Sequence, residues 1–256
     1  MKLKKINKNP FFSVITVVKN DEKNIEKTIK SILSQTLNDY EYIIIDGKSQ
    51  DKTFLKIQKY KKKIKKIISQ DDNGIYFAMN KGAKFATGEI IVFVNSGDIL
   101  KVNALKLIKR IFKQNNRVDF VFGTVLRHYT KNTILKYGYN RNRLKFNFDF
   151  ATSHSTGFFL KRKVFKKLGY FDTSYKCSAD YDIYYKVLLT LNLEGASTKK
   201  NQLIGIVKSG GFSSKINFIE HLFEETLIRI KNKQNIIFII IIFFNALLKY
   251  VVKKII

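Results

Sequence analysis

The feature that most constrains the fold of this chain is an alternation of short apolar runs with amphipathic segments between residues 11 and 122. The runs are rich in β-branched and aromatic residues, and the segments between them carry apolar residues at helical spacing. We expect strands at 11–18, 41–45, 64–69, 90–94 and 120–122, and helices at 25–33, 51–60, 75–86 and 105–112. Strands that alternate with helices predict an α/β fold with a mostly parallel sheet and helices on both faces.

The pattern changes after about residue 123 to shorter, aromatic-rich pieces. Residues 135–150 are rich in aromatic side chains, 157–160 predict a strand and 180–191 predict a helix. No linker rich in Pro, Gly or Ser separates the two halves of the chain, so we expect them to share one core. The predicted organisation is a first half at 1–122, a second half at 123–215 and a C-terminal helical tail at 216–256.

The C-terminal tail is basic and apolar. Residues 236–248 contain one polar side chain, Asn245, and the flanking lysines are Lys231, Lys233, Lys249, Lys253 and Lys254. A helix of this length reaches roughly 20 to 25 Å, less than the ~30 Å hydrocarbon core of a bilayer. We therefore expect a helix that lies on an anionic membrane surface, with a buried or oligomer-forming helix and a full span as alternatives.

Charge and cysteine content limit the partners and the compartment. The 48 Lys and Arg residues exceed the 20 Asp and Glu residues, for a net charge of +28, which indicates an anionic partner unless it only reflects the general composition. Nucleic acid is not expected, because the chain has no zinc spacing, basic heptad region or RNP-type strand. A single cysteine, Cys177, excludes an intrachain disulfide and fits a reducing compartment. No secretory signal is apparent, so we expect a cytoplasmic catalytic part.

Polar clusters follow three of the expected strands, and such strand ends form the ligand site of parallel α/β sheets. Asp46 closes one strand, and Gly47 lets the backbone turn sharply and a ligand approach. Residues 72–82 follow the next strand, and Asp98 closes a third after residues 95–97. Asp46 is suited to accept hydrogen bonds from a nucleobase or a ribose. Asp98 suits Mg²⁺ or Mn²⁺, which prefer oxygen ligands, although turn chemistry alone also explains such a cluster.

Seven motifs in one order and spacing resemble a known family. They are 13–18 (SVITVV), 34–36 (SQT), 44–53 (IIDGKSQDKT), 72–76 (DNGIY), 78–82 (AMNKG), 86–89 (ATGE) and 95–98 (NSGD). Together they closely resemble the inverting family 2 glycosyltransferases, and most of all the branch that builds bacterial capsule, exopolysaccharide and O-antigen repeat units. The resemblance covers residues 12 to about 215. It implies the GT-A fold, a Rossmann-like sheet with the nucleotide-sugar along its carboxyl edge.

The resemblance implies that residues 1–122 bind the nucleotide-sugar and form the donor half, and that residues 123–215 bind the acceptor and form the acceptor half. It also implies roles for residues of the donor half. Thr16 and Asp46 fall where the family holds the nucleobase, and Asp72 falls where it contacts the nucleoside. Asp98 takes the place of the last acid in the family's Asp-X-Asp element, which binds the Mn²⁺ or Mg²⁺ that bridges the diphosphate. Asn95, a further expected donor contact, stands with Gly97 where many members carry acids. Metal binding would then depend on one carboxylate.

In the acceptor half, residues 154–159, 169–172 and 179–182 resemble the acceptor-side pattern of the same branch. By that match Asp180 is the general base, which takes a proton from the acceptor hydroxyl as that oxygen attacks the anomeric carbon. Asp182 is the rival base and projects from a different face of a helix. The candidate contacts to acceptor or diphosphate are His154, Gly211 and Ser213, with a structural histidine and a plain surface turn as the alternatives.

These implications predict an inverting, metal-dependent glycosyltransferase of cell-surface polysaccharide biosynthesis. The expected donor is a nucleotide-sugar, a UDP-sugar first of all, and the expected acceptor is a lipid-linked saccharide at the inner face of the bacterial cytoplasmic membrane. The alternative is a catalytically inactive member that binds a partner, because acids are missing at Asn95 and Gly97. A Ser or Cys hydrolase is not expected, because the chain lacks a nucleophile elbow.

Overall fold

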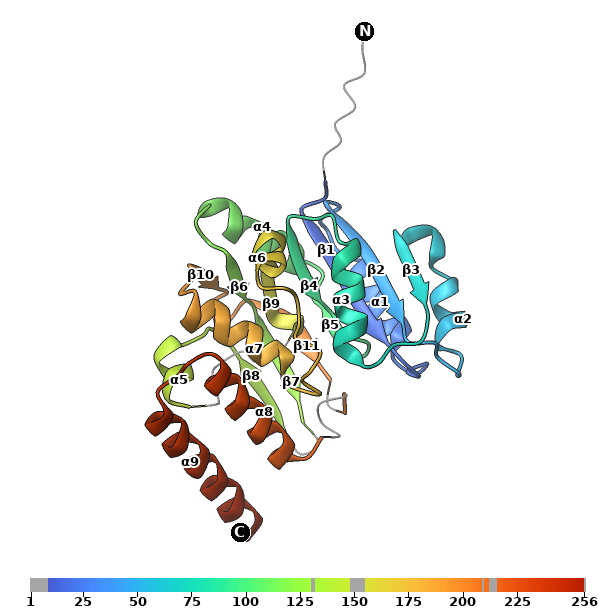
Figure 1. Cartoon of the computed structure of the whole chain (residues 1–256). Coiled ribbons are helices and arrows are strands. Elements are labelled where there is room, and N and C mark those ends of the chain that lie inside the picture. The colour runs from blue at the N-terminus through green and yellow to red at the C-terminus, as the bar shows by residue number, and fades with distance from the viewer. Residues whose placement is uncertain (1–8, 130–131, 148–154, 209, 212–215, 256) are drawn as a thin grey trace.

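A computed structural model describes residues 9–129, 132–147, 155–208, 210–211 and 216–255 of the chain (Figure 1). In chain order the elements are β1 (Phe12–Val18), α1 (Ile25–Leu33), β2 (Tyr40–Asp46), α2 (Thr53–Gln58), the 3₁₀ turn η1 (Lys61–Lys63), β3 (Lys66–Ser69), α3 (Ile75–Phe85), β4 (Ile90–Phe93), β5 (Ile99–Leu100), α4 (Ala104–Gln114), β6 (Phe120–Phe122), β7 (Thr124–His128), β8 (Thr133–Lys136), α5 (Arg141–Phe146), the 3₁₀ turn η2 (Ser155–Gly157), β9 (Phe158–Lys161), α6 (Arg162–Lys167), α7 (Ala179–Tyr185), the π-helical turn η3 (Lys186–Thr190), β10 (Gly195–Ser197), β11 (Leu203–Val207), α8 (Phe218–Lys231) and α9 (Ile236–Ile255).

The predicted alternation of strands and helices in the donor half is confirmed. The bounds differ for one strand and one helix of this half and for one helix of the acceptor half. The strand predicted from residue 64 begins later, as β3, because η1 and its C-cap occupy the preceding residues. The helix predicted at 51–60 is shorter and forms α2. In the acceptor half, the helix predicted at 180–191 is α-helical only over α7 and then widens into the π-helical turn η3.

The central sheet has seven strands in the order β10-β6-β9-β4-β1-β2-β3. All neighbouring pairs are parallel except those of β9, which runs antiparallel to both β4 and β6. A mostly parallel sheet is therefore confirmed. A second sheet of four short strands, β5-β11-β7-β8, was not predicted. Its outer strand β8 is exposed or half-buried throughout. The sequence of β8, TILK, also lacks the alternation of apolar and polar residues that identifies a strand.

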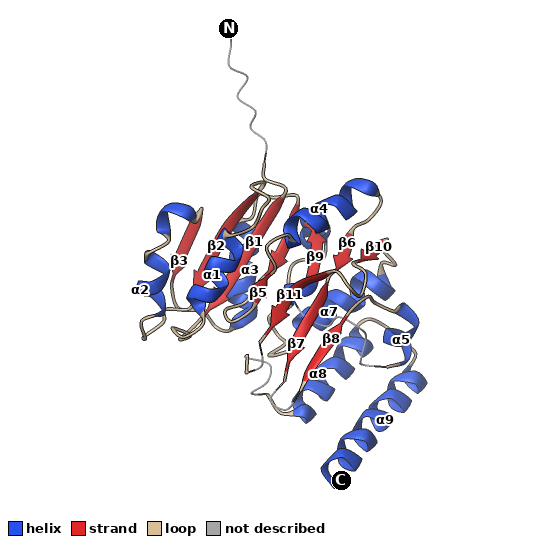
Figure 2. Ribbon diagram, turned by 180° about the vertical axis from the view of Figure 1, so that it is seen from behind, coloured by secondary structure: helices blue, strands red, loops and turns tan. Residues whose placement is uncertain are grey.

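The central sheet is covered on both faces, because alternate residues of β1 point to opposite sides. Ile15 and Val17 pack with α3, α6 and α7, whereas Val14 and Val18 pack with α1, α2 and α4. Figure 1 shows α3 and α7 in front of the sheet, and Figure 2 shows α1 and α4 on the opposite face. Since β9 of the acceptor half lies between β4 and β6, the two predicted halves share one sheet and one core. The boundary at residue 122 remains a prediction.

The last two helices pack against each other at the edge of the molecule, and α9 points away from the central sheet (Figure 1). Ile239 and Ile242 are buried, and the ring of Tyr250 stacks on Phe218 at 4.3 Å between centroids. Many other apolar side chains of α9 are exposed, among them Ile237, Ile241 and Phe244. No helix in the described part of the chain is long and apolar enough to cross a membrane.

Candidate active site

The candidate site lies at the carboxyl ends of β1, β2 and β4, where three polar clusters meet. In the register of the sheet, Val18 at the end of β1 lies beside Asp46 at the end of β2, and Asp46 lies beside Ser69 at the end of β3. The backbone turns sharply after two of these strands, with positive φ at Asn20 and Lys48. The strand ends therefore bring residues of separate segments to one edge, as predicted.

Asp46 is fully buried and builds the turn after β2. Its carboxylate accepts hydrogen bonds from the Ser49 N–H (3.2 Å), the Ser49 hydroxyl (2.5 Å) and the Ser69 hydroxyl (2.5 Å). Gly47 follows, and a Cβ at that position would lie only 2.8 Å from Oδ2 of Asp72. The absence of a side chain at Gly47 thus allows Asp72 to come close to the turn that Asp46 holds.

Asp72 leads into α3. Its Oδ1 accepts a hydrogen bond from the Gly74 N–H (3.1 Å), and Gly74 has φ of 129°, a conformation that L side chains rarely adopt. Asp72 is half-buried, so its carboxylate remains accessible beside Gly47. The polar stretch after β3 therefore places a carboxylate at the edge of the sheet and then begins a helix.

Thr16 lies within β1 and not at its end. It is fully buried, and its hydroxyl donates to the carbonyl of Val94 (2.7 Å) and is hydrogen-bonded to the Tyr42 hydroxyl (3.0 Å). These contacts connect β1 with β2 and with the end of β4. Its predicted contact to a nucleobase remains a prediction, and its position is that of a core residue.

Asn95 and Asp98 lie in the turn after β4. Asp98 is only 4% exposed; its carboxylate accepts hydrogen bonds from the Thr156 hydroxyl and from the Lys208 N–H (3.1 Å). Asn95 donates to the Ser155 hydroxyl (3.2 Å), and its buried Oδ1 has no hydrogen-bond partner among the described residues. An acceptor left in this state inside a protein indicates a missing ligand, water or ion.

The electrostatics of this turn are compatible with a divalent cation. Burial raises the pKa of Asp98 to about 7, against the smaller opposing effects of its hydrogen bonds and of Arg127. A nearby cation would favour the charged form of this carboxylate. Within the described part of the chain no three His, Cys, Asp or Glu side chains cluster as a metal site. Asp98 and the Oδ1 of Asn95 are oxygen ligands of the kind that a hard cation prefers, and such a cation would take most of its ligands from substrate phosphate and water.

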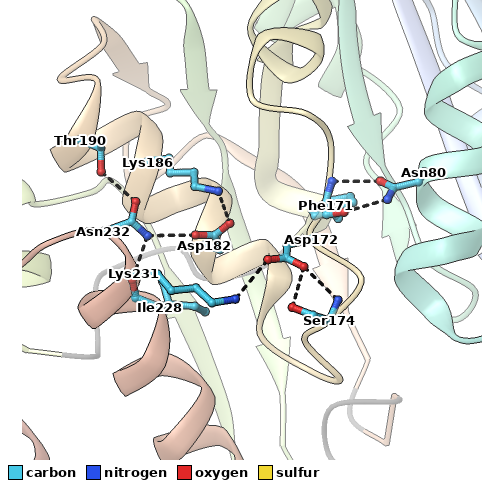
Figure 3. Close-up of polar contacts among 10 residues, drawn as sticks. All are labelled: Asn80, Phe171, Asp172, Ser174, Asp182, Lys186, Thr190, Ile228, Lys231 and Asn232. Atoms are coloured by element: carbon cyan, nitrogen blue, oxygen red, sulfur yellow. Dashed lines mark hydrogen bonds and ion pairs between the residues drawn. The ribbon is translucent and has the colours of Figure 1, made fainter.

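Asp180 and Asp182 lie on α7 but have different surroundings. Asp180 is half-buried, and its Oδ1 accepts hydrogen bonds from the Tyr76 hydroxyl (3.1 Å) and the Tyr181 N–H (2.9 Å). Burial raises the pKa of Asp180 above its ordinary value, although these hydrogen bonds and the charge of His221 oppose the change. Asp182 is buried and binds Lys186 Nζ (2.6 Å) and Asn232 Nδ2 (3.1 Å) (Figure 3). Asp182 therefore has a structural environment, and Asp180 has one suited to a base.

Tyr76 connects Asp180 to the segment that follows Asp72. It lies in the first turn of α3, four residues after Asp72, and its hydroxyl reaches a carboxylate 104 residues away in the sequence. Burial raises the pKa of Tyr184, the charge of Asp180 adds to this effect, and the charge of Arg127 on β7 opposes it. The hydrogen bond from Tyr76 thus connects the segment that follows Asp72 with Asp180.

Two of these residues have no signal in the sequence. Arg127 belongs to a strand of the unpredicted second sheet, and Tyr76 lies in a recognised motif that says nothing about its partner. Lys208 is a third such residue, since its Nζ binds Asn24 (2.6 Å) while its N–H binds Asp98.

Three predicted contacts remain, and Gly211 is the one that lies in the described part of the chain. Gly210 and Gly211 are exposed and follow Lys208, whose N–H binds Asp98. His154 and Ser213 lie outside the described residues. The predicted roles of Gly211, His154 and Ser213 therefore remain predictions.

Comparisons with known proteins agree with this geometry. Residues 13–178 match the family described as "Glycosyl transferase family 2". A Mycobacterium bovis (strain BCG / Pasteur 1173P2) protein named "PGL/p-HBAD biosynthesis glycosyltransferase" is 28% identical over 179 residues, which are 68% of each chain. The Escherichia coli protein "UDP-Glc:alpha-D-GlcNAc-diphosphoundecaprenol beta-1,3-glucosyltransferase WfgD" is 31% identical over 112 residues, 43% of this chain and 44% of that protein.

Solved structures share the fold. The structure of S. aureus TarS 1-349 in complex with UDP-GlcNAc has a TM-score of 0.71 at 19% identity and covers 86% of this chain and 65% of the TarS chain. This chain thus spans about two thirds of that fragment. The match over residues 13–178 means that the chain belongs to glycosyl transferase family 2, and the predicted GT-A fold is confirmed.

Proposed function

We propose that this protein transfers a sugar from a nucleotide-sugar to a hydroxyl of a lipid-linked saccharide with inversion, as a step in cell-surface polysaccharide biosynthesis. The observation that carries the proposal is the position of Asp180, a half-buried carboxylate hydrogen-bonded to the helix that begins just after Asp72. A base on the acceptor side and carboxylates at the strand ends then lie around one site.

Asp180 is the proposed general base. It would accept the proton of the acceptor hydroxyl while that oxygen forms a bond to the anomeric carbon and the nucleoside diphosphate leaves from the opposite face. A positioned base contributes roughly 10²- to 10⁴-fold to such a reaction. Asp182 is a poor rival, because it is buried and its carboxylate binds Lys186 and Asn232.

The proposed donor is a UDP-sugar, held by Asp72 and Asn95 beside the turn that Asp46 builds. Asp72 lies close to Gly47 at the end of β2, and the buried Oδ1 of Asn95 offers an acceptor. The printed names of the E. coli relative and of the S. aureus structure include UDP-Glc and UDP-GlcNAc, which supports this choice. Thr16 and Asp46 are left out of the proposed contacts, because the Thr16 hydroxyl is engaged inside the core and the buried Asp46 carboxylate has hydrogen bonds on both oxygens.

Asp98, with Asn95, is the proposed position of Mn²⁺ or Mg²⁺. When bound there, the cation would stabilise the charge of the leaving diphosphate. We expect Asp98→Ala to weaken nucleotide binding in the presence of Mn²⁺ by about tenfold or more, and to leave binding in EDTA unchanged. Equal Mn²⁺ dependence in the variant and the wild type, measured by calorimetry, would remove Asp98 from this role.

The C-terminal helices are the proposed contact to an anionic membrane surface at the cytoplasmic side. Large apolar side chains of α8 and α9 are exposed together: Phe223, Leu227, Ile230, Ile236, Ile237, Phe238, Ile240, Ile241, Phe244, Leu248, Val251 and Val252. Lys231, Lys233 and Lys249 are exposed beside them. An apolar face with flanking lysines fits a helix that lies in the interface of an anionic bilayer, and an apolar patch of this extent marks an interaction site.

Vesicle flotation tests the membrane contact. Replacement of Ile240, Ile241 and Phe244 by Glu should release the protein from phosphatidylglycerol vesicles, and Leu55→Glu, an equally exposed apolar position on α2, should not. Retained binding of the triple variant would assign membrane affinity to the general positive charge. Loss of a dimer in the triple variant would assign this face to self-association.

A thermal-shift screen tests the enzymatic function directly. UDP-, GDP- and dTDP-sugars are compared with and without Mn²⁺, because a ligand that binds the native state raises its stability. A rise in melting temperature with one nucleotide class, together with release of that nucleoside diphosphate during turnover, supports the proposal. No response to any nucleotide would favour the inactive, partner-binding alternative that Asn95 and Gly97 suggest.

A further inference from the structure

Three contacts hold the segment that carries Asp180, and two of them come from α3. The first is the hydrogen bond from the Tyr76 hydroxyl to Asp180 Oδ1 (3.1 Å). Tyr76 is only 7% exposed, and its ring packs against Phe171 at 5.3 Å between centroids. The hydroxyl of Tyr76 therefore reaches Asp180 from inside the core.

The second contact comes from Asn80, one helical turn further along the same face of α3. Its side-chain amide donates to the Phe171 carbonyl (2.8 Å), and its Oδ1 accepts from the Phe171 N–H (3.0 Å) (Figure 3). One side chain thus binds both the carbonyl and the N–H of Phe171. Phe171 follows Gly169 and Tyr170, both with positive φ. Asn80 thus fixes the start of the loop that leads to Asp180.

The third contact comes from the opposite side. The carboxylate of Glu224, on α8, accepts hydrogen bonds from three successive backbone N–H groups, those of Lys176 (2.6 Å), Cys177 (2.9 Å) and Ser178 (2.9 Å). These groups immediately precede α7. The backbone next to Asp180 is therefore fixed by α8, and its carboxylate is contacted by α3.

We propose that Tyr76 is a positioning residue for Asp180, holding Oδ1 so that Oδ2 faces the acceptor hydroxyl. Both hydrogen bonds that the described residues make to this carboxylate end on Oδ1. One oxygen is thus fixed, and the other remains to take the proton. This inference rests on the proposed function. It means that Tyr76, in the motif at 72–76 of the donor half, orients a carboxylate of the acceptor half.

The chemistry of the contact agrees with this role. Donation of a hydrogen bond to a carboxylate favours its charged form, which a base must have, and opposes the effect of burial. The other titratable groups near Asp180 are His221 of α8, Cys177 before α7 and Tyr184 on α7. Only Tyr76 among these donates a described hydrogen bond to the carboxylate. A phenylalanine at position 76 would fill the same space without that bond.

The test compares Tyr76→Phe with Tyr40→Phe. Tyr40 is a matched control, because its hydroxyl donates to the Ile32 carbonyl (2.9 Å) at the far end of β2. Turnover is measured as release of UDP from UDP-GlcNAc, or of the corresponding product from the donor that the thermal-shift screen selects. We expect kcat of Tyr76→Phe to fall about 10- to 100-fold, since a misplaced group can cost that much. The KM for the donor should stay near the wild-type value, and any fall in melting temperature should be small and should not account for the loss of kcat.

The pH profile separates positioning from a merely structural role. Loss of the hydrogen bond should raise the pKa of Asp180, so the acidic limb of kcat should move to higher pH in Tyr76→Phe and stay in place in Tyr40→Phe. Unchanged kcat and an unchanged acidic limb would overturn the inference. A fall in kcat that only follows a fall in melting temperature, with the limb unchanged, would also overturn it.

A measurement without turnover keeps this inference separate from the proposed function. Titration of ¹³C-labelled aspartates by NMR, assigned with Asp180→Asn, reports the pKa of Asp180 in both tyrosine variants. A higher value in Tyr76→Phe alone supports the contact even if no donor is turned over, in which case the proposed function fails and the contact stands. Equal values in Tyr76→Phe and the wild type overturn the contact.

Discussion

The two faces of α7 hold their carboxylates in opposite ways. On the face toward α3, Asp180 is half-buried and receives its hydrogen bonds on one oxygen. On the face toward α8, Asp182 is buried, and each of its oxygens has a partner, Lys186 and Asn232. Asn232 also binds Thr190, so this second carboxylate belongs to a network that holds α7, η3 and the end of α8 together (Figure 3).

The difference shows that two acids only two residues apart can have separate roles. Asp182 stabilises the packing of α7, and Asp180 keeps an oxygen available for chemistry. Two helical residues correspond to about 200° around the axis, so the side chains leave the helix in nearly opposite directions. A carboxylate with a cation and an amide on its two oxygens has little capacity left for a substrate proton. A carboxylate fixed through one oxygen keeps that capacity.

The largest expected effect separates the two faces directly. Asp180→Asn removes the proposed base and should lower kcat by about 10²- to 10⁴-fold, with nucleotide binding and melting temperature little changed. Asp182→Asn is the matched variant, and it should lower the free energy of unfolding by about 1 to 3 kcal/mol through the loss of a charged hydrogen bond to Lys186. Turnover and thermal melts measure both. Similar kcat losses in the two variants would end the distinction between the faces.

The next effect concerns the α3 side of the segment. Asn80→Leu leaves the carbonyl and the N–H of Phe171 without their partner, so the free energy of unfolding should fall by about 2 kcal/mol or more. Chemical denaturation measures the change. Lys84→Leu, an exposed position on the same helix, is the control and should change stability by less than about 0.5 kcal/mol. A stable Asn80→Leu variant would show that Phe171 is held by its ring alone.

A somewhat smaller effect is expected on the α8 side. Glu224→Gln removes the charge that receives three N–H groups and should cost about 1 to 2 kcal/mol of stability, because hydrogen bonds to charged groups are stronger than neutral ones. Glu220→Gln, one turn earlier on α8, loses only a contact to Lys176 Nζ at 3.4 Å between exposed side chains. Equal destabilisation by the two substitutions would contradict the importance of the backbone contacts.

The smallest effect should come from Lys231, whose Nζ lies 3.5 Å from Asp172 Oδ2 (Figure 3). Both side chains are well exposed, so Lys231→Met should change the free energy of unfolding by less than about 1 kcal/mol. The difference between the wild type and the variant should shrink further in 0.5 M salt. A larger, salt-independent loss would indicate that α8 holds the loop through this pair as well.

The sequence predicted the parts of the site that depend on local patterns. Alternating strands and helices located Asp46, Asp72 and Asp98 at strand ends, because the end of a parallel strand is marked by where its apolar run stops. The choice of Asp180 came from a family resemblance, and its surroundings agree with that choice. Asp182 could be set aside only in the structure, since its partner Asn232 lies 50 residues away.

Other parts depend on contacts that no short pattern records. Tyr76 and Asp180 are 104 residues apart, and Asn80 and Phe171 are 91 residues apart. The second sheet joins β5 and β11 across more than 100 residues; β5 has only two residues, and β8 is exposed or half-buried, so periodicity does not identify these two strands. The family resemblance implied a nucleobase contact for Thr16, whereas the structure shows its hydroxyl hydrogen-bonded to Tyr42 and Val94 inside the core.

Gly82 gives the contact between α3 and Asp180 a further consequence. A Cβ at this position would lie 2.5 Å from Ile15 Cγ2 and 3.3 Å from Ile45 Cγ1, so α3 rests directly on β1 and β2. The helix that carries Tyr76 and Asn80 is therefore seated on β1 and β2, and the end of β2 forms part of the proposed donor edge. The spacing between this edge and Asp180 is then set by the interior of the protein, so the surrounding loops can change in length and sequence without moving Asp180.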